Sequence, residues 1–329
     1  MLNDKSILIT GGTGSFGKMF TEIILKRFAP RRLIVFSRDE LKQFEMAHEF
    51  SKEKYPCIRY FIGDIRDKER LYRALQGVDF VIHAAAMKHV PASEYNPTEA
   101  IKTNIYGTQN LINVAADVGV QRLVALSTDK AVSPANLYGA TKLAADKLVV
   151  AANMFTGSAT RFSVVRYGNV MGSRGSVIPF FMNKRKEGVL PITDPRMTRF
   201  WISLEEGVNL VIKALHEAAG GEIYVPKIPS MNIMDLAKAI APECETKIVG
   251  IRPGEKLHER MIPMEDARHT LDMGDHFIIK PDHELFNFKG DLSAGKPVPE
   301  NFEYDSGTNN WWLTVDEMRT MLRQQGWGI

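Results

Sequence analysis

The sequence has 329 residues, of which 44% are hydrophobic and 25% are charged, and it therefore predicts a globular chain with a substantial core. Its 42 basic and 39 acidic side chains are spread along the chain and nearly cancel at a net charge of +3, so a nucleic-acid partner is not expected. No stretch approaches the roughly 18 apolar residues that cross a bilayer, and the first residues do not resemble a secretory signal, so we expect a cytoplasmic protein without a membrane partner.

The amino terminus has the pattern of a dinucleotide-binding turn. An apolar strand at residues 6–10 runs into a glycine-rich segment, and residues 18–28 have the apolar spacing of a helix. Gly11 permits a tight turn, Gly14 lets the backbone approach a pyrophosphate, and Gly17 lets the helix pack closely on the strand. The alternative is a glycine-rich turn without a ligand. The expected cofactor contacts are Gly11, Thr13, Gly14, Ser15, Phe16 and Gly17.

The end of the second predicted strand, residues 32–36, indicates which dinucleotide is bound. An acidic residue there typically bonds a ribose hydroxyl, whereas a cation bonds the 2′-phosphate of NADP. Ser37 and Arg38 follow this strand, with Lys42 beyond them. Because a guanidinium matches phosphate oxygens and can stack on adenine, Arg38 and Lys42 favour NADP over NAD.

Acidic residues near these strand ends have two interpretations. Asp39 and Glu40 weaken the preference for NADP, but both also suit the first turn of a following helix, where carboxylates complement the helix dipole. The third predicted strand, residues 58–62, is followed by Asp64 and Ile65. Asp64 is placed to accept a hydrogen bond from the adenine amino group, or it is a simple turn residue.

Apolar strands and helical patterns alternate along the first half of the chain. This alternation predicts an α/β fold, a doubly wound parallel sheet of the Rossmann type with ligands at the carboxyl ends of its strands. The two cysteines and eight histidines lack metal-ligand spacing, so no metal site is predicted. Residues 1–170 and 197–225 should form the dinucleotide-binding domain, and residues 171–196 and 226–329 a smaller mixed α/β substrate-binding cap. The further predicted elements are strands at 79–83, 122–126 and 162–166 and helices at 100–118, 201–218, 233–240 and 315–322.

A redox pair and an elimination pair occur next to each other after residue 126. Tyr138 and Lys142 are four residues apart and therefore share one face of a helix, where the ammonium favours a phenolate that can act as a base. Asp129 and Lys130 add a carboxyl and an amine that simple alcohol oxidation does not need, which suggests that a group is also eliminated. The alternatives are a packed tyrosine with a solvated lysine, and a turn cap at Asp129 with a surface ammonium at Lys130.

These motifs together resemble the extended short-chain dehydrogenase/reductases that act on nucleotide sugars. More narrowly, the sequence is similar to the UDP-N-acetylglucosamine 4,6-dehydratases that invert C5, the first enzymes of pseudaminic acid synthesis. Retaining dehydratases carry Asp-Glu where this chain has Asp129-Lys130, and large membrane-bound relatives carry methionine in place of Tyr138. The resemblance covers nearly the whole chain. Its motifs are Thr10-x-x-x-Gly14-x-x-Gly17, Ser127-Thr128-Asp129-Lys130, Tyr138-x-x-x-Lys142, Arg166-Tyr167-Gly168-Asn169-Val170, Thr193–Trp201 and Arg252-Pro253-Gly254-Glu255-Lys256.

The resemblance implies a role for each candidate residue. Tyr138, assisted by Lys142 and Thr128, would take the proton of the sugar C4 hydroxyl while hydride passes to NADP⁺. Lys130, if its neighbours keep it partly neutral, would then remove the C5 proton while Asp129 protonates the departing C6 hydroxyl, and hydride would return to C6.

The remaining positions implied by the resemblance bind cofactor or substrate. Cofactor contacts would include Ala84, Ala85 and Lys88, and the UDP-sugar would contact Lys88, Asn169, Val177, Arg199, Arg252 and Glu255. A solvated loop lysine and structural salt bridges are the alternatives. The family also implies a homo-oligomer, a dimer or larger.

Three functions remain open from the sequence. They are the inverting dehydratase, a nucleotide-sugar C4 or C5 epimerase on the same scaffold, and a non-catalytic NADP-sensing module.

Overall fold

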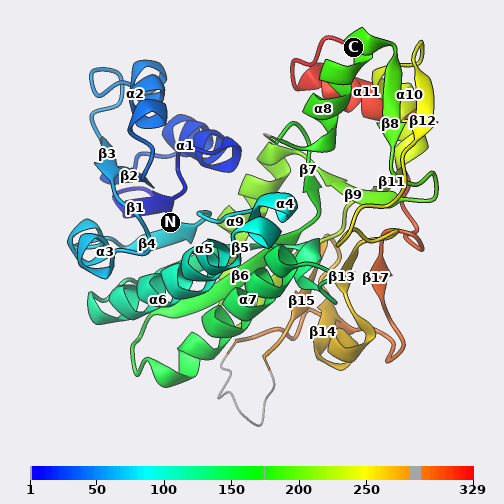
Figure 1. The fold of residues 1–329 in the computed structure, drawn as a ribbon. Coiled ribbons are helices and arrows are strands. Elements are labelled where there is room, and N and C mark those ends of the chain that lie inside the picture. Colours follow the sequence, from blue (N-terminus) through cyan, green and yellow to red (C-terminus); the bar gives the residue numbers. More distant parts are fainter. Residues whose placement is uncertain (1, 174, 282–289) are drawn as a thin grey trace.

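A large and mostly parallel β-sheet forms the centre of the computed structural model, which describes residues 2–173, 175–281 and 290–329 (Figure 1). The strand order reverses between β1 and β4, which is the arrangement of a doubly wound sheet. The predicted fold class is therefore confirmed. The parallel strands, in spatial order, are β3 (Ile58–Ile62), β2 (Arg32–Ser37), β1 (Ser6–Thr10), β4 (Phe80–His83), β5 (Arg122–Thr128), β6 (Arg161–Tyr167) and β10 (Ile223–Pro226).

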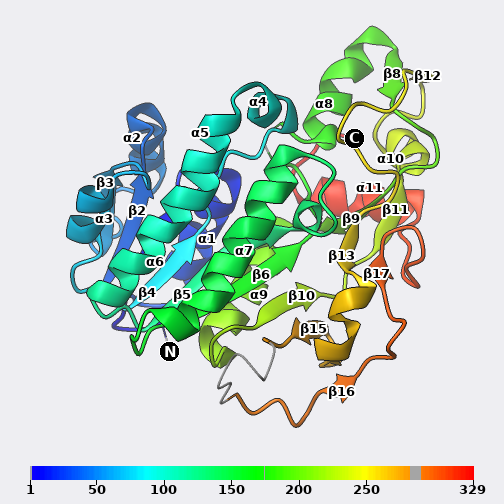
Figure 2. The same ribbon diagram turned by 60° about the horizontal axis from the view of Figure 1, so that its bottom comes forward.

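Helices cover both faces of this sheet, as right-handed crossovers require (Figures 1 and 2). On one face, α1 packs against α9, and α2 lies beside them. On the other face, α6 lies between α3 and α7. The helices are α1 (Ser15–Arg27), α2 (Glu40–Glu49), α3 (Lys68–Ala74), α4 (Val90–Tyr95), α5 (Pro97–Ile101), α6 (Gly107–Asp117), α7 (Leu137–Phe155) and α9 (Leu204–Glu217), with a π-helical turn at Lys102–Tyr106 before α6.

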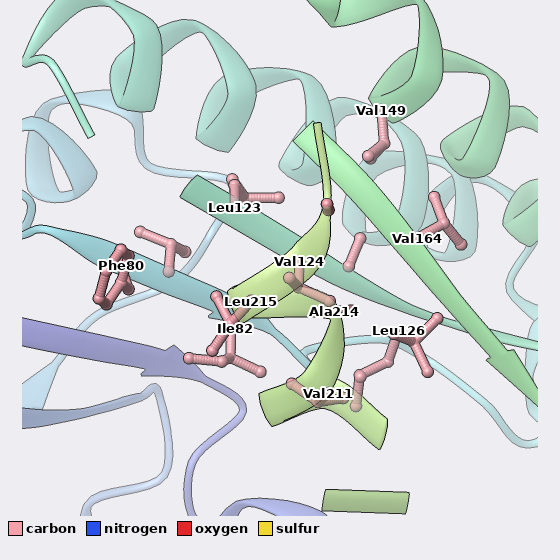
Figure 3. Packing of buried hydrophobic residues seen from close by; sticks show 14 of the residues in the cluster. Phe80, Ile82, Leu123, Val124, Leu126, Val149, Val164, Val211, Ala214 and Leu215 are labelled. Atoms are coloured by element: carbon pink, nitrogen blue, oxygen red, sulfur yellow. The ribbon is translucent and has the colours of Figure 1, made fainter. Parts of the chain in front are cut away.

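The main hydrophobic core lies between the central strands and the two helical layers (Figure 3). Val124 of β5 and Val164 of β6 are fully buried, with Val149 of α7 on one side of the sheet and Val211 of α9 on the other. Burying an aliphatic side chain of this size contributes roughly 1.5–3 kcal/mol. This packing fixes the strand ends that carry the polar residues of the site.

A smaller part of the molecule continues from the carboxyl ends of the central strands (Figure 1). It has its own core, in which Phe181, Trp201, Leu236 and Met318 are buried. Its strands are β7 (Asn169–Val170), β9 (Thr198–Ile202) and β11 (Ser230–Asn232) in one sheet, β8 (Val189–Ile192) paired with β12 (Glu245–Ile248), and β13 (Arg260–Ile262) paired with β17 (Tyr304–Asp305). Its helices are α8 (Val177–Lys184), α10 (Ile233–Ile240) and α11 (Val315–Gln324).

The structure differs from the sequence expectation at two places. The helix predicted at 201–218 begins at Leu204, because Ser203 and Glu206 form a reciprocal capping box that fixes its first turn, and Trp201 belongs to β9. Beyond β10, the large sheet continues antiparallel through β15 (His276–Ile279), β14 (Thr270–Asp272) and β16 (Lys296–Pro297). These three strands lie within the range 226–329 that was predicted as part of the cap, but they pair with the large sheet. The division into two domains stays a prediction.

Candidate active site

The turn after β5 and the start of α7 bring the catalytic candidates together. Asp129 opens a single 3-10 turn, η2 (Asp129–Ala131), and the Asn136 side chain caps α7 by accepting a hydrogen bond from the backbone of Gly139 at 2.8 Å. A Cβ at Gly139 would lie 2.1 Å from the carbonyl oxygen of Lys130. Because glycine leaves this space open, the helix start can contact the turn, and Tyr138 lies beside the Asp129-Lys130 pair.

The buried Asp129 forms an ion pair with Lys130, whose side chain is 26% exposed. The Lys130 Nζ donates to Asp129 Oδ1 at 2.9 Å and to Asn169 Oδ1 at 3.3 Å, and the Thr128 hydroxyl donates to the same Asp129 oxygen at 3.0 Å. Asp129 is inaccessible to solvent, and its Oδ2 has no hydrogen-bond partner within the described residues. A buried oxygen without a partner is costly unless it carries a proton or meets a ligand, so Asp129 is suited to donate a proton to a bound hydroxyl.

The electrostatics of this pair differ from the expectation for Lys130. Burial raises the pKa of Asp129, and the Glu259 carboxylate adds to that effect. Burial would lower the pKa of Lys130, but the carboxylates of Asp129 and Glu259 outweigh burial and raise it above its ordinary value. The condition of a partly neutral Lys130 is therefore not met in this state, because two carboxylates stabilise its ammonium. A proton moving from Lys130 to Asp129 gives a neutral amine and a neutral acid with the same total charge.

Tyr138 and Lys142 share the same helix, as predicted, but the expected phenolate is not stabilised here. The Lys142 Nζ donates to the carbonyl oxygen of Leu126 at 2.7 Å, and burial lowers its pKa. Burial raises the pKa of Tyr138 to about 12, although the Lys130 ammonium and a hydrogen bond with Thr128 act in the opposite direction. Burial therefore keeps Tyr138 a neutral phenol at neutral pH. Lys142, which was expected to activate it, donates to Leu126 instead.

The glycine-rich turn has the geometry of a dinucleotide cradle. Gly11 has a φ of +65°, and its missing Cβ leaves room for the backbone of Ala85, which would lie 2.9 Å away. A Cβ at Gly17 would lie 2.3 Å from the carbonyl oxygen of Gly12, so this glycine lets the helix approach the backbone of the turn. Helix α1 begins at Ser15 after Gly14, and among the described residues no side chain accepts a capping hydrogen bond at Gly14. An uncapped helix amino terminus beside bare backbone suits a pyrophosphate.

Polar and aromatic side chains lie in and around this turn. The Thr13 hydroxyl hydrogen-bonds Ser37 at 2.9 Å, and Phe16 stacks on Tyr167 with ring centroids 6.4 Å apart. Ala84 and Ala85 follow β4, and the backbone nitrogen of Ala85 donates to the Thr10 hydroxyl at 3.3 Å. These predicted cofactor residues therefore lie next to the glycine turn.

Arg38 and Asp64 lie close together at the strand ends expected to hold the adenosine. The Arg38 guanidinium is 61% exposed and lies 3.7 Å from Asp64, whose carboxylate also accepts hydrogen bonds from Arg66. The side chain of Ile65 is buried in the core, so only its backbone is available to a cofactor.

The start of α2 shows the role of Asp39 and the partner of Lys42. Asp39 caps α2 by accepting from the backbone of Lys42 at 3.0 Å, and it also pairs with the Lys42 ammonium. Asp39 therefore lies at the helix start, as the residue before the predicted first turn, Glu40 lies in that first turn, and Lys42 is engaged by Asp39.

Of the predicted substrate residues, Asn169 contacts the reactive pair directly and Lys88 interacts with it electrostatically. Asn169 contacts Lys130, as given above. Lys88 is exposed, and its pKa is lowered by partial desolvation and then by the Lys130 ammonium, so it lies within electrostatic reach of the pair. Arg252 is exposed and lies 3.8 Å from Glu255, and Val177 is the first residue of α8.

Arg199 is the predicted substrate residue with the most protein contacts. Its guanidinium donates to the carbonyl oxygens of Thr198, Leu257 and Lys256 at 2.7, 3.0 and 3.1 Å, and its side chain is only 13% exposed. These contacts attach the segment 252–259 to β9. The same segment is held to the catalytic turn and to α7, because Lys256 donates to the Val132 carbonyl at 2.7 Å and Asn136 donates to the Gly254 carbonyl at 2.8 Å.

Two charged residues of the site were not predicted from the sequence. Glu259 is 3% exposed and lies 3.4 Å from Lys130, and Lys256 lies 3.4 Å from Glu259. Their spacing of three residues was visible in the sequence, but no local pattern indicated that the segment folds back onto Lys130. Within the described ranges, no cluster of three metal-ligating side chains occurs, and none of the helices has the length and apolarity to span a bilayer.

The comparisons with known proteins agree with this geometry. Residues 7–281 match the model of a family described as polysaccharide biosynthesis proteins. The chain is 56% identical to the UDP-N-acetylglucosamine 4,6-dehydratase (inverting) of Campylobacter jejuni, with 98% of each chain covered. It is also 40% identical to a UDP-glucose 4-epimerase of Rickettsia canadensis, with 98% of this chain and 96% of the relative covered.

A solved structure extends the comparison to the cofactor. DesIV, a dTDP-glucose 4,6-dehydratase from Streptomyces venezuelae with NAD and TYD bound, is similar to this chain with a TM-score of 0.69. The two sequences are 26% identical, and the match covers 77% of this chain and 86% of DesIV. The chain therefore belongs to the polysaccharide biosynthesis protein family and, as its motifs indicate, is an extended short-chain dehydrogenase/reductase.

Proposed function

We propose that this protein is an NADP-dependent hydro-lyase that converts UDP-N-acetylglucosamine into UDP-2-acetamido-2,6-dideoxy-L-arabino-hexos-4-ulose. The observation that carries the proposal is the ion pair between the buried Asp129 and Lys130 beside Tyr138, because this pair holds both a proton donor and a proton acceptor. The high identity to the inverting dehydratase of Campylobacter jejuni supports the choice of substrate.

The residues of the glycine turn fit a nicotinamide dinucleotide. Gly11 and Gly17 have no side chain that would cover the neighbouring backbone groups. Among the described residues, no side chain accepts a capping hydrogen bond at the start of α1. A bound nicotinamide dinucleotide supplies the hydride acceptor for C4 and the hydride donor for C6. DesIV holds NAD, and we propose NADP for this chain because the exposed guanidinium of Arg38 is available to a 2′-phosphate, whereas Asp39 serves as a helix cap.

Tyr138 is the base for the first step. It takes the proton of the C4 hydroxyl, while Thr128, which hydrogen-bonds the Tyr138 side chain, holds the same sugar oxygen. Tyr138 would act as this base once an opposite charge of the bound dinucleotide favoured its phenolate, because its pKa is raised by burial in the free protein. Oxidation at C4 makes the C5 proton acidic.

Asp129 and Lys130 carry the elimination. A proton moves from Lys130 to Asp129 over the 2.9 Å contact, which leaves a neutral amine and a neutral carboxyl. The Lys130 amine takes the C5 proton, and Asp129 gives its proton to the C6 hydroxyl, which leaves as water. A proton delivered to the opposite face of C5 after hydride returns to C6 gives the L-configured product.

A C4 epimerase is the second candidate, favoured by the 40% identity to the Rickettsia relative. An epimerase would use Tyr138 and Lys142 without a buried acid aimed at C6. The unpartnered Oδ2 of Asp129 has no role in that reaction, and we therefore place the dehydratase first.

The test is incubation of the purified protein with UDP-N-acetylglucosamine in D₂O, followed by mass spectrometry and NMR. We expect loss of one water, a C6 methyl group and deuterium at C5 with inverted configuration. Lys130→Ala should stop water loss while dinucleotide binding is retained. An unchanged substrate mass with altered C4 configuration would instead identify an epimerase, and dinucleotide binding without turnover would identify a sensing module.

Three broader expectations accompany this proposal. On the strength of the family resemblance, we assign the product to pseudaminic acid synthesis and expect a homo-oligomer, which light scattering can test. A cytoplasmic location stays a prediction.

A further inference from the structure

Glu259 is a buried acidic residue for which the proposed mechanism has no role. It immediately precedes β13, and its Oε1 lies 3.4 Å from the Lys130 Nζ. Its backbone is clamped on both sides by Ser306, which accepts from the Glu259 nitrogen through its hydroxyl and donates to the Glu259 carbonyl oxygen through its own nitrogen, each at 2.8 Å. This double contact fixes the backbone that carries the Glu259 side chain.

Three cations surround this carboxylate. Besides Lys130, Lys256 lies 3.4 Å from Oε2, and the Nε of Arg199 lies 3.9 Å from Oε1. Burial alone would raise the pKa of Glu259, but these three cations outweigh burial and lower it, so Glu259 is ionised. Its Oε2 makes no hydrogen bond to any of the described residues, so its interactions there are electrostatic.

The other charged residues near Glu259 either interact with the Asp129-Lys130 pair or have partners of their own. Asp129 contacts Lys130, while Tyr138 and Lys88 interact with the pair through space. The flanking residues have their own partners, since His258 hydrogen-bonds Thr198 and Arg260 pairs with Asp305 and Glu303. Glu259 is thus a second carboxylate on the ammonium of Lys130.

We propose that Glu259 is a positioning residue that keeps one shared proton on the Asp129-Lys130 pair across the working pH range. This inference rests on the proposed function. The elimination needs one proton on the pair in total, which sits on Asp129 when Lys130 acts as base. If both Asp129 and Lys130 are protonated, Lys130 cannot act as the base. If neither is protonated, Asp129 cannot act as the acid. A fixed negative charge beside Lys130 favours protonation of both groups, so it raises the pH at which each proton is lost.

The sign of the effect follows from the charges that remain when Glu259 is neutralised. Without its carboxylate, Lys130 faces Lys256 and Arg199 uncompensated, and both cations favour loss of protons from the pair. Both limbs of the pH–rate curve should then move to lower pH, by about one to three units for a charge at this distance. A residue that only supports the fold would lower the rate without moving the curve.

The experiment measures kcat against pH for the wild type, Glu259→Gln and Glu259→Asp with UDP-N-acetylglucosamine and the dinucleotide. We expect Glu259→Gln to shift both limbs toward acid, and Glu259→Asp, which keeps the charge, to retain the wild-type pH dependence even if its rate is lower. Glu222→Gln is the matched control, because Glu222 is equally buried, at 1% exposure, but accepts hydrogen bonds from the backbone of Ala219 and Gly220. Unmoved limbs in Glu259→Gln would overturn the inference.

A spectroscopic readout separates this inference from the proposed function. The infrared band of the protonated Asp129 carboxyl, identified by its loss in Asp129→Asn, can be titrated in the folded protein without substrate. Glu259→Gln should move that titration to lower pH, and an unchanged titration would contradict the inference. If the wild type fails to remove water from UDP-N-acetylglucosamine, the proposed function is wrong, whereas the infrared titration still reports whether Glu259 controls the proton on the pair.

Discussion

Adding one methyl group at Gly139 should impair catalysis far more than folding. The Cβ of Gly139→Ala would lie 2.1 Å from the Lys130 carbonyl oxygen, whereas close carbon–oxygen contacts are about 3.3 Å. The start of α7 must therefore move from the catalytic turn by about 1 Å. A misplacement of that size can reduce a rate by about 100-fold, because Tyr138 and the Asp129-Lys130 pair no longer meet one sugar ring together.

The effect on stability should be small by comparison. Overpacking costs about 1–3 kcal/mol, while alanine gains roughly 1 kcal/mol over glycine in a helix, so a net loss of about 0–2 kcal/mol is expected. Urea unfolding gives this value, and the assay of water loss gives the rate. Gly207→Ala is the matched control, because Gly207 also lies near a helix start, but its Cβ would have ordinary contacts at 3.9 Å. A Gly139→Ala enzyme with wild-type turnover would refute the argument that this glycine sets the catalytic geometry.

Two further predictions concern the cofactor and the acid stability of the fold. Arg38→Ala should weaken NADP binding by about 10- to 100-fold through loss of a charged hydrogen bond and leave NAD binding nearly unchanged. Titrations with both dinucleotides test this, with Arg196→Ala as an exposed control, and equal weakening of both would remove the phosphate contact. His83 is held between the hydroxyls of Thr10 and Thr108 at 2.8 and 2.9 Å, and burial lowers its pKa to about 3. Because this pKa is lower in the folded than in the unfolded chain, its stabilising contribution is present above the unfolded value of about 6.5 and is lost as the pH falls toward 3. From about pH 7.5 to about pH 5 the loss should be about 2 kcal/mol in urea unfolding, and His83→Gln should remove this part of the pH dependence; an equally steep dependence in the variant would contradict it.

The sequence predicted those features that depend on local pattern. Strand and helix periodicity predicted the doubly wound sheet, and the two carboxylates after the second strand indicated the helix start at Asp39 and Glu40. The electrostatics were predicted less well, because they depend on contacts made by the folded chain. The carbonyl of Leu126 engages Lys142, and Glu259 reaches Lys130 from a segment far along the chain. Neither contact has a local signature.

The extension of the large sheet was missed for a related reason. Strands β14 and β16 have only three and two residues, too few to show a period, and their pairing depends on β15 being in place. Short antiparallel strands of this kind are specified by their neighbours in space rather than by their own sequence.

The attachment of residues 252–259 to both β9 and the start of α7 has a thermodynamic consequence. A ligand that binds the exposed end of this segment, near Arg252, and shifts it also acts on the Gly254 and Lys256 contacts to Asn136 and Val132. By linkage, any such ligand that favours one arrangement of the reactive groups must bind more tightly to that arrangement, by the same factor. The affinity of a ligand near Arg252 and the population of the favoured arrangement of the reactive groups then report the same coupling free energy.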